Sequence, residues 1–183
     1  MSTILEDLLA FTPHNEEEAA DRQLMIDAAR NPASYGREWP AHFTASAWTV
    51  NPEHTETLMV YHNVYDSWSW VGGHADGETD LAQVAARELC EETGIEQASL
   101  AMNGLLSCEI LTVDGHWKRG AYVPSHLHLN ATYLFEASTA QATRIAPDEN
   151  SGVKWMPFEE ALRASTEPWM VEHVYRKLVA LCR

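Results

Sequence analysis

The segment RELCEETGI, residues 87–95, places Glu88, Glu91 and Glu92 close together in the chain. On an α-helix, positions related as i, i+3 and i+4 share one face. Like charges so placed destabilise a helix, and the negative end of its dipole increases the repulsion. A hard divalent cation such as Mg²⁺, which prefers carboxylate oxygens, would neutralise this charge. The alternative is a solvated acidic face, in which Arg87 pairs with Glu91 one turn further on.

The residues around this segment predict a helix with defined ends. Asp80 can act as N-cap with Gln83 three residues later, and Gly94 suits the position after the last turn. One face at helical spacing is apolar and predicted to be buried, namely Leu81, Val84, Ala85 and Leu89.

The distance from a preceding glycine makes the segment part of a longer and more specific sequence pattern. Gly73 stands 14 residues before Arg87, and the run that follows is Arg87-Glu88-Leu89-Cys90-Glu91-Glu92-Thr93-Gly94-Ile95. This pattern resembles the signature box of the Nudix hydrolase family. The first glutamate of the family pattern falls on Thr79, with Glu78 one position early. The resemblance implies an α/β fold, the Nudix-type α/β/α sandwich with a mixed central sheet.

The resemblance also implies a chemistry. Nudix hydrolases cleave a diphosphate (P–O–P) linkage in a nucleoside diphosphate derivative, with bound Mg²⁺ or Mn²⁺. By carry-over, Glu88, Glu91 and Glu92 are the metal ligands and catalytic residues, with the carbonyl group of Gly73 as a further ligand. Arg87 is expected to hold the glutamates in position.

Two further groups of residues are candidates for the same site. In some relatives an additional acid lies in the loop before the final strand, where this chain has Asp148 and Glu149, of which Glu149 is the candidate; an ordinary polar turn is the alternative. Trp68 and Trp70 lie just upstream of the box and could stack on a nucleobase, although core packing is the commoner use of tryptophan.

Four histidines form a separate set of candidates. His126 and His128 alternate along a predicted strand and so point to one face. His42 and His74 occupy positions that resemble metal ligands of the type 1 isopentenyl diphosphate isomerases, a second branch of the same fold. This resemblance implies a second, transition-metal site, with phosphate contacts as the alternative. It does not extend to the isomerase chemistry, because Gly72 stands where that branch has a catalytic cysteine.

The rest of the chain predicts one domain with an N-terminal helical extension. Residues 2–30 are expected to be helical, with a second helix capped by Thr12, and the domain boundaries are 1–38 and 39–183. Expected strands are 42–50, 56–62, 98–113, 126–136 and 153–156, followed by helices over 158–164 and 168–183. The segment DGHWKRG, residues 114–120, is predicted to be a turn.

Composition excludes several classes of protein. The chain has 12 Lys and Arg against 27 Asp and Glu, and a formal net charge of -15. Such a surface repels phosphate backbones, so no nucleic acid partner is expected. No signal peptide or apolar span is present, which predicts no membrane partner, and three cysteines without CxxC spacing fit a cytoplasmic protein. A small-molecule substrate is expected, with a homodimer as a candidate assembly. The alternatives to a hydrolase are an isomerase of the branch named above and a non-catalytic Nudix-fold ligand-binding module.

Overall fold

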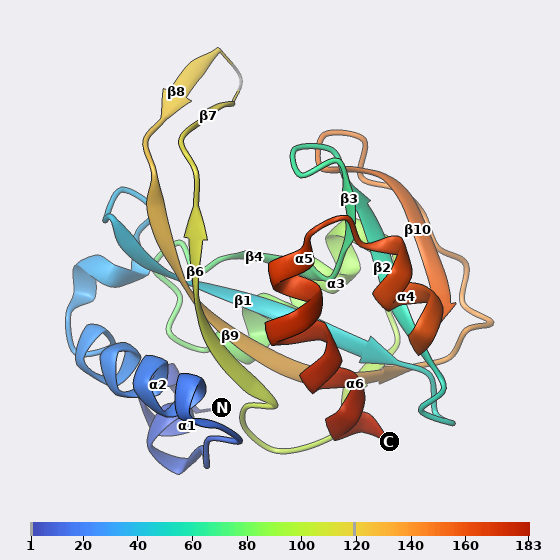
Figure 1. Cartoon of the computed structure of the whole chain (residues 1–183), viewed down its shortest axis with the longest axis horizontal. Helices are drawn as coiled ribbons and strands as arrows, with labels where there is room; N and C mark the ends of the chain where they lie inside the picture. Colours follow the sequence, from blue (N-terminus) through green and yellow to red (C-terminus); the bar gives the residue numbers. More distant parts are fainter. Residues whose placement is uncertain (1, 119) are drawn as a thin grey trace.

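A mixed eight-stranded sheet forms the centre of the protein in a computed structural model that describes residues 2–118 and 120–183 (Figure 1). Its strands are β1 (Ala41–Val50), β2 (Glu56–His62), β3 (Ser67–Ser69), β4 (Val71–His74), β5 (Ala98–Leu100), β6 (Ser107–Val113), β9 (His126–Ala137) and β10 (Asn150–Pro157). The order is β10-β2-β1-β9-β5, with β3 beside β2, β4 beside β1 and β6 beside β9. β1 and β9 are parallel, which requires a long crossover connection. That connection contains the helix of the acidic box.

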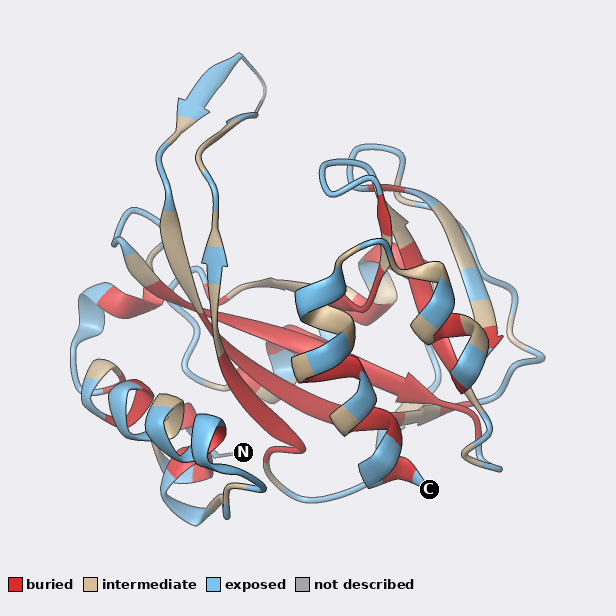
Figure 2. Ribbon diagram, in the orientation of Figure 1, coloured by how far each residue is buried: buried red, intermediate tan, exposed pale blue. Residues whose placement is uncertain are grey.

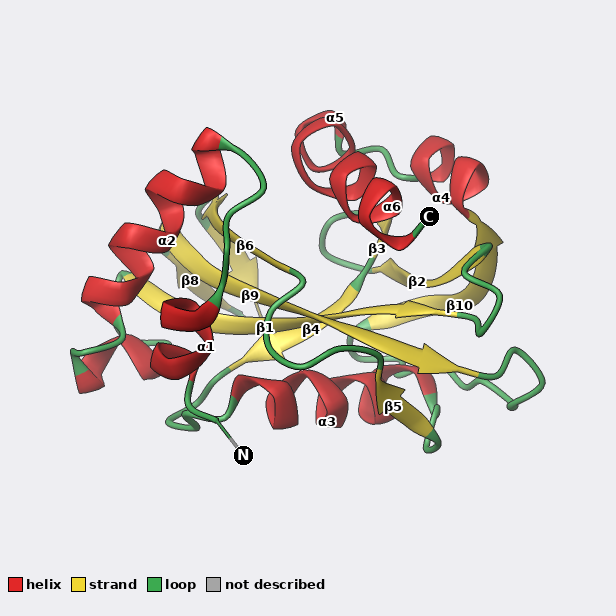
Figure 3. Ribbon diagram, turned by 90° about the horizontal axis from the view of Figure 1, so that it is seen from below, coloured by secondary structure: helices red, strands yellow, loops and turns green. Residues whose placement is uncertain are grey.

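Helices cover both faces of the sheet (Figure 3). α3 (Leu81–Thr93) lies on one face, and α4 (Phe158–Ala164), α5 (Pro168–Met170), the π-helical turn η2 (Val171–Tyr175) and α6 (Arg176–Cys182) lie on the other. The backbone stays helical through Met170 and Arg176, so α5, η2 and α6 form one continuous helix. The predicted α/β/α sandwich is confirmed.

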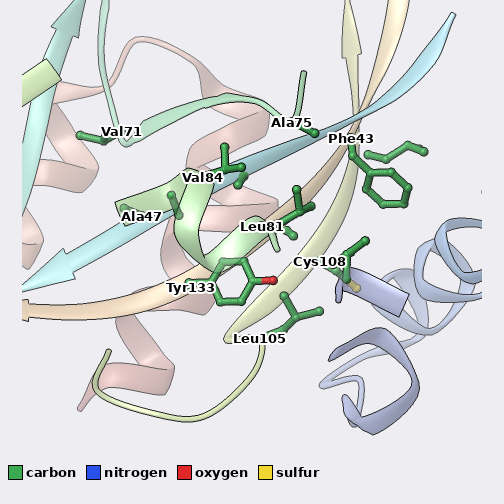
Figure 4. Packing of buried hydrophobic residues seen from close by; sticks show 14 of the residues in the cluster. Phe43, Ala47, Val71, Ala75, Leu81, Val84, Leu105, Cys108 and Tyr133 are labelled. Atoms are coloured by element: carbon green, nitrogen blue, oxygen red, sulfur yellow. The ribbon is translucent and has the colours of Figure 1, made fainter. Parts of the chain in front are cut away.

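Each face of the sheet has its own hydrophobic core. The core under α3 includes Phe43, Leu81, Val84 and Tyr133, which pack together in Figure 4. The second core joins the sheet to the C-terminal helices around Trp48. The side chains of even-numbered residues of β1 point toward the C-terminal helices and those of odd-numbered residues point toward α3, as strand alternation requires. Figure 2 shows the buried strands between the two helical layers.

The N-terminal region is helical as expected, but its second helix begins later than predicted. Its elements are α1 (Ile4–Ala10), α2 (Glu16–Ala28) and η1 (Pro32–Tyr35). The side chain of Asn15, not Thr12, caps α2 by accepting the N–H of Glu18 at 2.8 Å, since Asn is an equally good cap. Ile4 and Leu8 join the core under α3. The boundary at residues 38 and 39 stays a prediction.

Two predictions for the middle of the chain are wrong. The expected strand over 98–113 is interrupted between β5 and β6, where Gly104 has a left-handed φ of 79°. The expected turn over 114–120 instead contains β7 (His116–Lys118), which pairs with β8 (Ala121–Val123) in a hairpin that projects from the sheet (Figure 1). Residue 119 lies outside the described residues. None of the helices in the described chain has the length and apolarity to cross a membrane.

Candidate functional site: a cleft over the sheet

A cleft of about 1290 Å³ opens on the face of the sheet that also carries the C-terminal helices. Residues of β1, β4 and β9 line its floor, including Ser46 and Asn130. Asp114 and Gly115, before β7, border one end, and α5 with the turn after β2 borders the other. The cleft therefore lies between the projecting hairpin and the C-terminal helix.

The three box glutamates line this cleft from α3. The predicted caps of the helix are confirmed, because Asp80 accepts the N–H of Gln83 and Gly94 has a left-handed φ of 77°. Glu91 is exposed, whereas Glu92 is only 4% exposed.

Burial gives Glu88 and Glu92 unusual electrostatics. Burial, with the charges of Glu149 and Glu88, raises the pKa of the Glu92 carboxyl to about 8 against the opposing hydrogen bond from Gly72. Burial also raises the pKa of Glu88, and Glu91 and Glu149 act in the same direction, while Arg87 opposes them. The protein itself thus leaves these carboxylates short of positive charge.

Two glycines of β4 bring its backbone against the glutamates. The backbone N–H of Gly72 donates to Oε1 of Glu92 at 3.2 Å. A Cβ atom at Gly73 would lie 2.3 Å from the carboxyl carbon of Glu88. Only glycine allows this close approach, which leaves carboxylate oxygens beside peptide groups. This oxygen-rich cradle has the donor chemistry that Mg²⁺ and Mn²⁺ prefer.

Arg87 pairs with its neighbour in the box. Its Nη2 donates to Oε1 of Glu88 at 3.0 Å. Glu78 is engaged elsewhere, because its Oε1 accepts the N–H groups of Thr79 and Asp80 at 2.8 and 3.2 Å. Glu78 thus holds the turn before α3.

The four candidate histidines gather at the end of the cleft nearest β7. His42 and His128 are partners in the parallel pairing of β1 and β9, and His74 reaches them from β4. Potential ligand atoms of His42, His74 and His128 all lie within 4.8 Å of one another. Nε2 of His126 lies 3.1 Å from Nε2 of His128. Sequence reasoning identified all four residues as candidates for one site, and the structure brings them together.

The other candidates are divided between the cleft and its surroundings. Glu149 and Trp70 line the cleft. Trp68 is not among the lining residues; its ring packs edge-on against Tyr61, with centroids 5.5 Å apart. Sequence reasoning missed other lining residues, among them Tyr65, Glu167 and Trp169.

Comparison with known proteins identifies the fold and the family. Residues 40–180 match the model of the NUDIX domain. A Caenorhabditis elegans Ap4A hydrolase in a binary complex superposes with a TM-score of 0.55 at 22% identity, covering 75% of this chain and 95% of that one. The Escherichia coli dihydroneopterin triphosphate pyrophosphohydrolase gives a TM-score of 0.56 at 14% identity, covering 75% and 94%. A NUDIX-family hydrolase from Clostridium perfringens gives 0.53 at 20% identity, covering 76% and 97%.

These solved structures share the fold, and the family model spans the sheet, the glutamate helix and the C-terminal helices. The box is intact from Arg87 to Ile95, and its four charged side chains, Arg87, Glu88, Glu91 and Glu92, line the cleft. The chain belongs to the Nudix hydrolase family.

Proposed function

We propose that this protein hydrolyses a P–O–P linkage in a nucleoside diphosphate derivative. The observation that carries the proposal is the buried carboxyl group of Glu92 beside Glu88 in an open cleft, with too little positive charge from the protein. Two similar structures are named for hydrolysing Ap4A and dihydroneopterin triphosphate, which supports the reaction class.

A divalent cation, Mg²⁺ or Mn²⁺, would be held by Glu88, Glu91 and Glu92 with the carbonyl oxygen of Gly73. Bound there, it would neutralise phosphate charge and lower the pKa of an attacking water. Arg87 holds Glu88 in place through their ion pair. As water attacks phosphorus and the P–O bond breaks, a carboxylate of the cleft accepts the proton of the water. A box glutamate or Glu149 fills this role.

The histidines favour a second cation at the end of the cleft nearest β7. Nδ1 of His42 donates to the carbonyl oxygen of Trp39 at 2.7 Å. In the neutral ring, Nε2 then carries the lone pair that can bind a cation. That Nε2 is buried and has no hydrogen-bond partner in the described part of the chain. Burial, followed by the charges of the other histidines, lowers the pKa of His128 to about 2. Neutral imidazoles suit Zn²⁺, Mn²⁺ or Fe²⁺.

A panel of nucleoside triphosphates, nucleotide sugars and dinucleoside polyphosphates, incubated with Mg²⁺ or Mn²⁺, tests the hydrolase. We expect release of phosphate or a nucleoside monophosphate from at least one compound. Glu92→Gln keeps the shape but removes the charge, so turnover should fall about 100-fold or more. Glu96→Gln, an exposed position just beyond α3, is the control and should keep full activity.

The alternatives give different results. A ligand-binding module would bind compounds of the panel without cleaving them. An isomerase would convert isopentenyl diphosphate without releasing phosphate, and Gly72 in place of the catalytic cysteine argues against it.

A further inference from the structure

The end of the cleft opposite the histidines carries aromatic rings and one carboxyl group. Tyr65 is 43% exposed and stacks on His62 with centroids 4.2 Å apart. Trp169 is 51% exposed and stacks on His173 at 4.9 Å. Both rings line the cleft, and a histidine supports each of them. Flat, supported rings open to a cleft are surfaces on which a planar heterocycle stacks.

Glu167 is the residue before α5 and lines the same cleft as the two rings. Its neighbour Thr166 is hydrogen-bonded to the residues that follow Tyr65. The N–H of Thr166 donates to Oγ of Ser67 at 2.9 Å, and its hydroxyl group donates to the carbonyl oxygen of Asp66 at 3.4 Å. Because Asp66 follows Tyr65 and Thr166 precedes Glu167, this last hydrogen bond brings Tyr65 and Glu167 near each other, and both line the cleft. The carboxyl group and the tyrosine therefore belong to one end of the cleft.

The carboxyl group of Glu167 lacks the donors that a buried oxygen needs. Its Oε2 is buried and accepts no hydrogen bond from any residue that the structure describes. Leaving such an acceptor unpaired destabilises the folded protein, and native proteins rarely do so without a role for the group. Since the residue lines the cleft, a rotation of its carboxyl group would bring this oxygen to a ligand that supplies the missing N–H groups.

The position of this end suits the nucleoside part of the proposed substrate. β4 and the residue before it run from Trp70, whose N–H donates to the hydroxyl group of Tyr175 on the C-terminal helix at 3.4 Å, past Gly73 to His74. At about 3.3 Å per residue, Trp70 and Gly73 are roughly 10 Å apart along the strand. That separation leaves room for a ribose between a base held by the rings and a diphosphate held at the glutamates.

We propose that Tyr65, Glu167 and Trp169 form a guanine-binding subsite. The two oxygens of an ionised carboxylate are acceptors only. Guanine presents two adjacent donors, N1–H and the 2-amino group, on one edge. Adenine and cytosine present an amino donor beside a ring-nitrogen acceptor, and uracil presents one N–H between two carbonyl groups. The subsite deepens the proposed function and rests on it for the placement of the diphosphate.

Binding of uncharged nucleosides tests the subsite without hydrolysis or metal. Isothermal titration calorimetry of the whole protein would compare guanosine, inosine, which lacks the 2-amino group, and adenosine. We expect guanosine to bind about 10-fold more tightly than inosine, because one charge-assisted hydrogen bond is lost, and adenosine to bind more weakly still. Trp169→Ala should weaken all three about equally.

Glu167→Gln isolates the carboxylate. Its amide group turns a donor toward one N–H of guanine, so the preference for guanosine over inosine should disappear. Glu172→Gln is the matched control, since Glu172 lies on the helix that follows Glu167, pairs with Arg176 and does not line the cleft. It should bind like the unchanged protein.

Two results would overturn the subsite: an unchanged preference in a folded Glu167→Gln variant, or adenosine binding as tightly as guanosine to the unchanged protein. The nucleotide panel reports separately on hydrolysis. Guanosine binding without any cleavage would reject the proposed function alone, whereas cleavage without base preference would reject the subsite alone.

Discussion

The ammonium group of Lys177 on α6 lies 2.7 Å from Oε1 of Glu18 on α2, with both side chains largely shielded from solvent. The same Nζ lies 3.0 Å from Oε1 of Glu109 on β6, and the hydroxyl group of Ser107 donates to Glu18 at 2.6 Å. This buried cluster joins the N-terminal and C-terminal helices through the sheet. Asn130 extends it toward the cleft by donating to Glu109 at 3.3 Å.

Replacing Lys177 by Met should destabilise the fold strongly. The substitution leaves two buried carboxylates without a cation, so the free energy of unfolding should fall by about 3–5 kcal/mol. Urea unfolding followed by circular dichroism measures the change. Lys154→Met is the control, because Lys154 and Glu160 form an exposed pair, for which about 0–1 kcal/mol is expected. Equal effects of the two substitutions would contradict a structural role for the cluster.

The same cluster should make stability depend on pH in acid. Burial alone would raise the pKa of Glu18, but the hydrogen bonds from the backbone of His14, from Lys177 and from Ser107 outweigh it, and the pKa lies below its ordinary value of 4.5. A lowered folded-state pKa means that the unfolded chain binds more protons. The stabilisation is therefore complete above 4.5 and is lost as the pH falls through the lower, folded-state pKa.

Unfolding free energies measured from neutral pH into this acid range check the sign. Lys177→Met removes the cation that lowers the pKa of Glu18, so the variant should lose less additional stability on acidification than the unchanged protein. Parallel curves for the two proteins would assign the acid dependence to other carboxylates.

Gly73→Ala should impair catalysis more than stability. The added methyl group would displace the Glu88 carboxyl group from its place against β4, while Glu88 can swing toward the open cleft. Turnover should fall about 10- to 100-fold, as is typical when the support of a metal ligand is lost. The measurements are the rate on the best panel substrate and the midpoint of thermal unfolding. Gly36→Ala is the control, because its Cβ would meet the flexible end of Glu38 at 3.2 Å and the carbonyl oxygen of Ala33 at an ordinary 3.7 Å.

Protein purified without a histidine tag should contain a transition metal at the histidine end of the cleft. Elemental analysis should find about one ion of Zn, Mn or Fe per chain, as the converging imidazoles of one site imply. The double substitution His42→Ala, His74→Ala should abolish it, and His173→Ala on the C-terminal helix should not. Two results together would reject the site. The unchanged protein would contain no transition metal, and added Zn²⁺ would bind the double variant as tightly as His173→Ala.

The glutamate helix could be predicted in detail because its signals are local. Caps, the apolar face and the spacing of Glu88, Glu91 and Glu92 all act within a few turns of one helix. The exposure of its residues could not be predicted, because it depends on the approach of β4. Glu92 is buried by a glycine strand 20 residues away in the chain, which no periodicity reports.

The histidine end could be predicted only in part for the same reason. Alternation alone places His126 and His128 on one face. The parallel register that sets His42 beside His128 is a contact between residues 86 positions apart, formed only when the sheet assembles. Glu167 gave no local signal at all, since an unpaired oxygen is a property of its surroundings in the folded chain.

The ion pair between α2 and α6 also limits how this protein can be shortened for laboratory use. A fragment cut to the family match, residues 40–180, would discard Glu18 together with the apolar side chains of Ile4 and Leu8. Lys177 would then face one carboxylate instead of two, and a hydrophobic surface under α3 would be uncovered. Fusion proteins and crystallisation fragments should therefore begin ahead of α1, because aggregation is the expected fate of the shorter chain.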